Sequence, residues 1–404
     1  MIPLIVLSVL LTILVQARET SVRCWRLQDL TEFCDYRDVC YSQSEGLIIG
    51  KRGTEPYNRL EIINQGGINP YSHVVKEDYR NEGLLPWRAF IGGIAVNPDV
   101  IDDPKNTWFR ANTSLLMAFD ADVPNIFHTS EKILAGYGSL WFLNQLDSPV
   151  GDFDAVHLLR PERSLGNWEK EFITILFEQS AITGQLFYSE AMEQYRNRRL
   201  CFRRLVVPGT AIFFFGGPTQ ALETRTLVYR TALHSVVPVC DKKLLTIIQR
   251  KSTRRIVNLD DVVEMVVQPL GVPFQIVYLE ELSFKEQVRV MAESRVLVAV
   301  HGAGLSNVMF MQPNAVVLEL FAYNYVYHLY HNIATASGLF HIAYEAGRDE
   351  TLYPGDIPLD RHSSYLCLSD GSCASSTKNS DVKLKMDKFA ASLSFALSLV
   401  GPCH

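Results

Sequence analysis

The residues best suited to chemistry lie in a glycine-rich turn within Arg295–Phe321. The turn reads His301-Gly302-Ala303-Gly304-Leu305-Ser306-Asn307, and it follows an apolar run that ends at Val300. Glycines at such a turn let backbone N–H groups approach an anion, and the start of a helix adds a favourable dipole. We expect the amides of Ala303 to Ser306 to face the diphosphate of a nucleotide.

A carboxylate follows in the next apolar run. Glu319 belongs to Ala315–Phe321 and is expected at the sheet edge where the ribose of a nucleotide would lie. A carboxylate in that position can accept hydrogen bonds from both ribose hydroxyls. The sequence therefore predicts Glu319 as a ribose ligand.

Three other interpretations of the turn are open. A dinucleotide fingerprint requires a glycine where this chain has Asn307, and a longer helix. A hydrolase nucleophile elbow requires glycines at a different spacing around Ser306. A tight turn in an ordinary parallel sheet is the third, and the residues of the turn alone do not exclude it.

Apolar runs and amphipathic segments alternate in the last third of the chain. The expected strands are Lys243–Gln249, Phe274–Leu279, Val296–Val300 and Ala315–Phe321, with helices between them at Leu259–Leu270, Phe284–Ser294 and Leu305–Met311. Continuous apolar strands that alternate with helices indicate a parallel sheet buried on both faces. We predict a doubly wound α/β domain, which binds ligands at the carboxyl ends of its strands.

The N-terminal half is less regular. Cys24 to Pro104 is rich in turns, cysteine and aromatic residues, and short strands in irregular structure are expected there. The remaining expected elements are helices at Asn125–Gly136 and Trp168–Gly184, strands at Arg203–Val207 and Ala211–Phe215, a crossing segment at Thr224–Asp241 and a final helix within Asp381–Val400. A GPI-anchor signal is the alternative for that last segment.

The first seventeen residues form a separate apolar segment. Ile2–Val15 is shorter than the ~20 residues of a membrane span, and Val15-Gln16-Ala17 resembles a signal peptidase site. No Lys or Arg precedes the run, so a short signal anchor and a buried element remain alternatives. We predict a signal peptide at 1–17 and a location in the lumen of the endoplasmic reticulum or Golgi, or secretion. Membrane contact is expected only if the segment is an uncleaved anchor.

Eight cysteines follow this segment: Cys24, Cys34, Cys40, Cys201, Cys240, Cys367, Cys373 and Cys403. An even number behind a signal peptide indicates disulfides, although eight cysteines allow 105 connectivities. Cys34 with Cys40 and Cys367 with Cys373 are close enough to form local pairs. No zinc-site spacing is present, and one sequon, Asn112-Thr113-Ser114, can carry an N-glycan if it is exposed.

Length and charge limit the class of protein. The chain has 404 residues, 48% of them hydrophobic, and a formal net charge of -6. This length suggests two domains. The negative net charge argues against nucleic acid or an anionic membrane surface as a partner.

The run Arg295–Phe321 resembles the signature of glycosyltransferase family 61. That family includes plant xylan xylosyl- and arabinosyltransferases and animal protein O-linked N-acetylglucosaminyltransferases. Upstream, Leu244–Lys251 is similar to the family's strand that ends in a basic pair, and Asn125-Ile126-Phe127-His128 fits its N-x-[FY]-H pattern. The resemblance extends from about residue 112 to 330.

The resemblance implies a GT-B fold, with two facing Rossmann-like, doubly wound domains that contain parallel sheets. The corresponding division is an acceptor-side α/β domain at 18–225, a nucleotide-sugar-binding domain at 226–366 and a cysteine-containing tail with a final helix at 367–404. The implied reaction is inverting transfer of N-acetylglucosamine or a pentose from a UDP-sugar donor to a protein or glycan acceptor. It also implies that the turn His301 to Ser306 belongs to the donor site.

Basic residues follow the strand predicted at Lys243–Gln249, namely Arg250, Lys251, Arg254 and Arg255. A diphosphate leaving group gains negative charge as the sugar departs, so fixed cations stabilise the transition state. Arginine can also bind phosphate oxygens through two hydrogen bonds. A solvated basic loop is the alternative. The strand end and the resemblance together favour Arg250 as a ligand, followed by Arg254.

Inverting transfer also requires a base for the acceptor hydroxyl. The candidate is His128, for which a helix-capping or core histidine is the alternative. Relatives usually carry an acidic residue four positions later, where this chain has Lys132, so Glu131 is the expected substitute. Two D-x-D patterns, Asp120-Ala121-Asp122 and Asp152-Phe153-Asp154, resemble metal–diphosphate sites. In a GT-B arrangement cations and a helix dipole replace the metal, so no metal or further cofactor is expected.

Three functions compete. The first is a lumenal glycosyltransferase. The second is a sugar-nucleotide-binding pseudoenzyme or lectin-like protein, which Lys132 permits. The third is a nicotinamide-dependent oxidoreductase, which Asn307 and the short helix disfavour.

Overall fold

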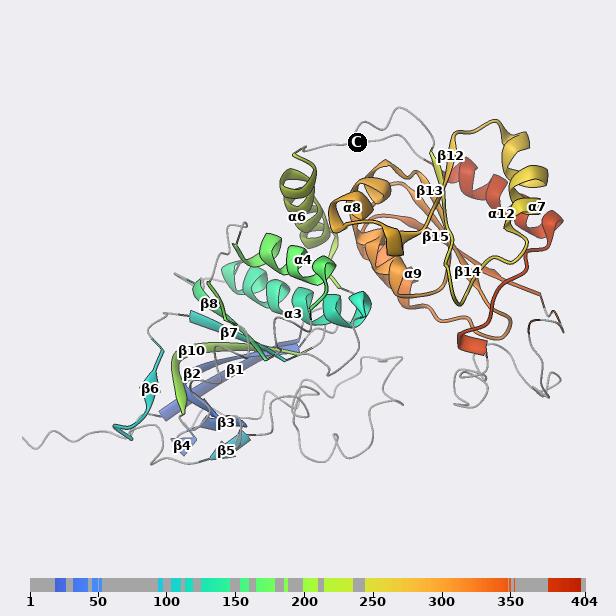
Figure 1. Cartoon of the computed structure of the whole chain (residues 1–404). Helices are drawn as coiled ribbons and strands as arrows, with labels where there is room; N and C mark the ends of the chain where they lie inside the picture. Colours follow the sequence, from blue (N-terminus) through green and yellow to red (C-terminus); the bar gives the residue numbers. More distant parts are fainter. Residues whose placement is uncertain are drawn as a thin grey trace, which may run out of the picture.

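The computed structural model describes residues 19–26, 32–42, 46–49, 51–52, 94–96, 103–109, 113–118, 125–145, 153–159, 165–178, 185–187, 199–209, 214–234, 244–347, 349, 352 and 377–400. Two sheets, each with its own helices, lie side by side (Figure 1). The expected signal peptide, the sequon residue Asn112 and the pair Cys367 and Cys373 lie outside these ranges.

The N-terminal sheet contains both parallel and antiparallel pairs. Its path is β4 (Lys51–Arg52), β1 (Glu19–Arg26), β2 (Glu32–Ser42), β10 (Leu200–Pro208), β7 (Thr113–Ala118), β8 (Phe153–Leu159) and β9 (Gln185–Phe187). Strands β10, β7, β8 and β9 are parallel, whereas β2 is antiparallel to both β1 and β10. The prediction of a parallel sheet in this half is thus wrong for the pairs β1–β2 and β2–β10.

Strand β2 also corrects the expectation of only short strands before Pro104, because it has 11 residues. Its burial is not evident from the sequence, because β2 contains several charged residues. Asp35 is 7% exposed and accepts hydrogen bonds from Arg204 of β10, which is 4% exposed. Pairing on both edges satisfies the backbone of β2, so the strand is interior despite its charged residues.

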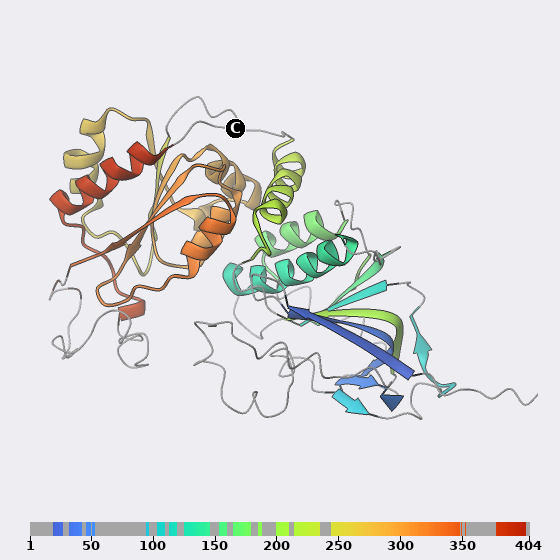
Figure 2. The same cartoon turned by 180° about the vertical axis from the view of Figure 1, so that it is seen from behind.

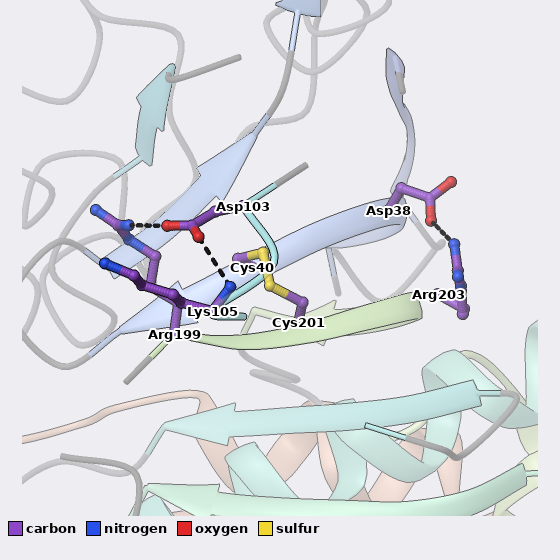
Figure 3. Close-up of a disulfide and its surroundings, with 7 residues drawn as sticks. All are labelled: Asp38, Cys40, Asp103, Lys105, Arg199, Cys201 and Arg203. Atoms are coloured by element: carbon purple, nitrogen blue, oxygen red, sulfur yellow. Dashed lines mark hydrogen bonds and ion pairs between the residues drawn. A yellow bond between two sulfur atoms is a disulfide. The ribbon is translucent and has the colours of Figure 1, made fainter. Parts of the chain in front are cut away.

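A disulfide joins the same two strands. Cys40 and Cys201 face each other in the register of β2 and β10 and are bonded (Figure 3). The expected local pair of Cys34 with Cys40 is therefore wrong, because Cys40 has a partner 161 residues away. Cys34 is itself disulfide-bonded. Around this disulfide, Asp38 pairs with Arg203 at 2.9 Å.

Helices α3 (Ile126–Gln145) and α4 (Asn167–Glu178) lie on the face of this sheet that is turned toward the C-terminal unit (Figures 1 and 2). Helix α3 begins where the Asn125 side chain accepts a hydrogen bond from the Phe127 N–H at 3.0 Å. It extends past the predicted end at Gly136 to Gln145. Residues 129–140 are all buried, because α3 packs between the sheet and the C-terminal unit.

The C-terminal sheet is parallel throughout, as predicted. Its order is β12 (Phe274–Val277), β11 (Leu245–Ile248), β13 (Val296–Val300), β14 (Val316–Phe321) and β15 (Phe340–Glu345). One face carries α8 (Phe284–Glu293), the 3-10 helix η8 (Ala303–Phe310) and α9 (Leu329–Ala336), and the other carries α7 (Leu259–Val262) and α12 (Met386–Leu399). Each face of the sheet packs in a separate hydrophobic core. Within β13, Leu297 belongs to the core beneath α8, η8 and α9, and Val298 belongs to the core beneath α7 and α12.

The N-terminal and C-terminal units share the core that lies beneath α8, η8 and α9. It runs from α3, α4 and α6 (Pro218–Val228) into α8, η8 and α9. Buried polar contacts cross the same boundary: Trp168 Nε1 donates to Asn307 Oδ1 at 3.1 Å, and Arg225 Nη1 donates to the Met311 carbonyl at 2.9 Å. Among the described residues, no helix has the length and hydropathy needed to span a membrane.

Candidate functional site

The predicted glycine turn lies at the carboxyl end of β13, where η8 begins at Ala303. The Leu305 N–H donates to the Gly302 carbonyl at 2.9 Å, so this amide is used inside the turn. Leu305 and Ser306 are 1% and 0% exposed. Of the amides expected to face an anion, those of Ala303 and Gly304 remain at the start of the helix, where intrahelical partners are missing.

Two arginines lie against Gly302. A Cβ atom at this glycine would be 2.7 Å from Arg250 Nη1 and 3.0 Å from Arg254 Nη1. Arg254 Nη1 also donates to the His301 carbonyl at 3.0 Å. Both arginines follow β11, whose Ile248 is in register with Ala299 of β13, so the loops after the two strands meet. The structure thus brings together the glycine turn and the two arginines that the sequence favoured.

The other two basic residues of this segment have carboxylate partners. Lys251 pairs with Glu281, and Arg255 forms a two-point contact with Asp381 at 2.7 and 3.1 Å. Both side chains are about half exposed. They are therefore surface ion pairs, whereas Arg250 and Arg254 are turned toward the glycine turn.

Arg250 and Arg254 carry little compensating negative charge. The nearest carboxylate contact of Arg250 in the described residues is Glu280 Oε1, 3.9 Å from Nε. The guanidinium of Arg254 donates to neutral oxygens of His301 and Asn379, and its buried Nε has no hydrogen-bond partner in the described part of the chain. Burial, and then the charge of Arg250, lower the pKa of Arg254. An anion placed between these groups would offset both effects.

Glu319 differs from its expected role. It lies inside β14, its side chain is 0% exposed, and both carboxylate oxygens are engaged. His301 Nδ1 is 2.6 Å from Oε1, and His341 Nε2 is 2.7 Å from Oε2. We correct the prediction of a ribose contact, because a carboxylate without accessible surface cannot reach a nucleotide directly. Its observed contacts orient His301 instead.

Aromatic rings surround the imidazole of His301. Phe321 stacks on it with ring centroids 5.4 Å apart, and Tyr325, Tyr327 and Tyr330 contact it at 5.3–5.9 Å. Sequence reasoning missed these tyrosines. Their signal was the run Tyr323–Tyr330, which contains four tyrosines directly after β14.

His128 and Glu131 form a second imidazole–carboxylate pair in the first turn of α3. His128 Nδ1 is 2.9 Å from Glu131 Oε2, and the side chains are 55% and 11% exposed. The Phe127 ring contacts Tyr330, whose pKa is raised by burial, by Glu319 and, to a smaller extent, by Glu131. Tyr330 therefore lies between the two pairs. Lys132 is buried, at 7% exposure.

Gly304 and Asn307 have structural roles. A Cβ at Gly304 would be 3.1 Å from Leu279 Cδ1. A side chain at this position would therefore meet the protein rather than fill ligand space. Asn307 Nδ2 donates to Gln287 Oε1 and to the Gly304 carbonyl, which fixes η8 against α8.

The acidic side chains of both D-x-D patterns lie outside the described part of the structure. Among the residues that are described, no cluster of His, Cys, Asp and Glu is suited to a metal ion.

Comparison with known proteins gives a family match and several relatives. A family model described as Glycosyltransferase 61 matches residues 86–318. Protein O-linked-mannose beta-1,4-N-acetylglucosaminyltransferase 2 of Tetraodon nigroviridis is 36% identical over 83 residues, which are 20% of this chain and 14% of that protein. A beta-1,2-xylosyltransferase of Oryza sativa subsp. japonica is 38% identical over 80 residues, covering 20% of this chain and 17% of the relative.

A longer match involves the EGF domain-specific O-linked N-acetylglucosamine transferase of Xenopus laevis. It is 27% identical over 184 residues, 41% of this chain and 34% of the relative. The matched regions thus span between about a seventh and about a third of the length of these three relatives.

Proposed function

The chain belongs to glycosyltransferase family 61, and from this premise we propose that it transfers a sugar from a UDP-sugar to a hydroxyl group of a protein or polysaccharide. The observation that carries the proposal is the approach of the Arg250 and Arg254 guanidiniums to Gly302 at the start of η8. Two cations and the amides of a helix start are suited to a diphosphate. Relatives that act on proteins and a relative that is a xylosyltransferase support both acceptor classes.

The reaction we propose is a single displacement with inversion. The acceptor oxygen attacks the anomeric carbon, the bond from that carbon to the diphosphate oxygen breaks, and UDP leaves with the bonding electrons. Arg250, Arg254 and the amides of Ala303 and Gly304 stabilise the charge that develops on the diphosphate. No divalent cation is required in this scheme.

His128 is the proposed base. With its Nδ1 hydrogen donated to Glu131, the Nε2 lone pair takes the proton of the acceptor hydroxyl. Glu131 then stabilises the imidazolium. The exposure of His128 permits contact with an acceptor, and Tyr330 connects the neighbourhood of Glu131 to that of His301.

The domain arrangement we propose is GT-B, with an acceptor-side unit at 18–225 and a donor-side unit at 226–366. Two adjacent α/β units, one with an entirely parallel sheet, support it. We also propose that the protein works in the lumen of the endoplasmic reticulum or Golgi, or is secreted. The Cys40–Cys201 disulfide supports an oxidising compartment.

A sugar-nucleotide-binding protein without transferase activity is the second candidate, and Lys132 at the family's acidic position favours it. The test is incubation with UDP-N-acetylglucosamine, UDP-xylose or UDP-arabinose and an acceptor panel of mannosylated peptide, EGF-domain peptide and xylan. Mass spectrometry of a glycosylated product together with UDP release would support transfer. Binding of UDP-sugars with neither product nor UDP release would favour the second candidate.

A further inference from the structure

Three neighbouring strands each supply one member of a buried hydrogen-bonded chain. Glu319 lies in β14, His301 follows β13, and His341 lies in β15. The carboxylate bridges His301 Nδ1 at 2.6 Å and His341 Nε2 at 2.7 Å. The side chain of His341 is 3% exposed. His341 lies outside the set of residues that take part in the proposed reaction.

The two short contacts define where the hydrogens lie. Burial lowers the pKa of His341 to about 4, so its ring is neutral near pH 7 and has a single N–H. That hydrogen must be on Nε2 for His341 to donate to Glu319. When Glu319 is ionised it accepts from both rings, so the hydrogen of His301 is on Nδ1. In a neutral His301 ring, Nε2 then has a lone pair that can accept a hydrogen bond.

Removing the N–H donor of His341 would change which atoms of Glu319 and His301 carry hydrogen. Burial raises the pKa of Glu319, whereas its hydrogen bond with His301 lowers it. Without His341, one carboxylate oxygen would be buried and unpaired, which favours the protonated acid. A protonated Glu319 would donate to His301 Nδ1, and the hydrogen of that ring would move to Nε2.

Other charged or titratable groups lie at both ends of the hydrogen-bonded chain His301–Glu319–His341. On the His301 side they are Arg254, Tyr325 and Tyr330, with Glu131 beyond Tyr330. On the His341 side, the His331 ring is 5.2 Å away, and burial, followed by His341 and His328, lowers the pKa of His331. Among the groups named, Arg254 is the fixed cation, and it donates to the His301 carbonyl.

We propose that His341 is a positioning residue: by donating to Glu319 it fixes the hydrogen of His301 on Nδ1, so that His301 Nε2 accepts a hydrogen bond from a hydroxyl group of the bound UDP-sugar. The identity of the ligand rests on the proposed function. The position of the hydrogen is a property of the protein alone. The two parts can therefore fail separately.

The first test is nitrogen NMR of the unliganded protein with labelled histidine, the His301 signals being assigned by their loss in His301→Asn. Wild-type protein near pH 7 should show His301 protonated at Nδ1 and unprotonated at Nε2. Folded His341→Leu should show the opposite tautomer or a mixture. His341→Gln, which retains an N–H donor, and His331→Ala, which removes a neighbour not bonded to Glu319, should resemble the wild type.

An Nε2-protonated His301 in the wild type would overturn the inference without any variant. So would a folded His341→Leu protein in which the tautomer of His301 is unchanged.

The second test is calorimetry with pyrophosphate, UDP and UDP-N-acetylglucosamine. His341→Leu should weaken ligands that carry the recognised hydroxyl by about two- to tenfold, the usual effect of one hydrogen bond between neutral groups. Pyrophosphate should bind as to the wild type. Weaker binding of both UDP and UDP-N-acetylglucosamine assigns the hydroxyl to the ribose. Weaker binding of UDP-N-acetylglucosamine alone assigns it to the sugar.

An equal loss for pyrophosphate, or no loss for any ligand, would contradict the hydrogen bond to the ligand. If wild-type protein binds neither UDP nor the UDP-sugar, the proposed function fails, and the NMR result still decides the role of His341.

Discussion

The Arg254 guanidinium donates to the main-chain carbonyl of His301 at 3.0 Å. This contact links the loop after β11 to the glycine turn after β13 without using a carboxylate. Arg254 has a left-handed backbone, with φ of 60°, a conformation that residues other than glycine seldom adopt. The cation is therefore held in place while its charge remains available to an anion.

Gly302→Ala should weaken UDP binding by about tenfold or more without lowering the melting temperature. The added methyl group would displace at least one of the two guanidiniums, and each charge-assisted hydrogen bond contributes about 1.5–3 kcal/mol. Backbone strain is not expected, because φ of Gly302 is 164°, an extended value. Calorimetry and thermal unfolding of the same sample would measure both quantities.

Gly304→Ala is the matched control for this variant. Its methyl group would meet Leu279 Cδ1 at 3.1 Å, so the expected effect is on stability. UDP affinity of the folded fraction should change less than in Gly302→Ala. The reverse order of affinities would show that the wrong glycine has been assigned to the ligand.

His128→Ala should lower the rate of sugar transfer by about 10²–10⁴-fold, the usual contribution of a general base. UDP affinity should stay at the wild-type value, because the arginines and the glycine turn are unchanged. Glu131→Gln should also slow transfer by removing the charge that stabilises the imidazolium. Initial rates and UDP affinity must be measured together, and an unchanged transfer rate in His128→Ala would exclude it as the base.

His157 should make the fold less stable at acidic pH. Its side chain lies between Phe109 and Phe202, and burial lowers its pKa from 6.5 to about 3. Below pH 6.5 the unfolded chain binds a proton that the folded protein does not. The stability contribution is therefore complete above about pH 6.5 and is lost as the pH falls toward 3, by ~1.4 kcal/mol per pH unit.

His157→Phe removes this titration. Between pH 6 and 5 it should reduce the dependence of the unfolding free energy on pH by about 1.4 kcal/mol per pH unit. Denaturant unfolding at several pH values tests it. Equal slopes for the two proteins would mean that His157 is not the group responsible.

The parallel C-terminal sheet could be predicted from sequence because its strands are continuous apolar runs bounded by turns. The meeting of Arg250 with the glycine turn followed from it, since both lie in loops after neighbouring parallel strands. The mixed N-terminal sheet could not be predicted in the same way. In β2 the burial of Asp35 depends on Arg204, which is 169 residues away.

The prediction that Glu319 contacts the ribose was wrong for a related reason. A carboxylate near the end of a strand is equally consistent with a ligand contact and with a buried partner. The register of β14 with β15 decides between them, because it pairs Val317 with His341 and thereby brings the second imidazole to Glu319. Neither the strand β15 nor its register was part of the sequence pattern used.

Titration calorimetry with UDP tests the central assignment, the binding of a nucleotide diphosphate by the arginines at the glycine turn. Wild-type protein should bind UDP, and Arg250→Ala should bind it about ten- to a hundredfold more weakly. Lys251→Ala is the matched control, because it removes the adjacent positive charge, which is paired with Glu281 at the surface. It should bind UDP nearly as the wild type does. Equal affinity of folded Arg250→Ala and Lys251→Ala proteins for UDP would contradict the account.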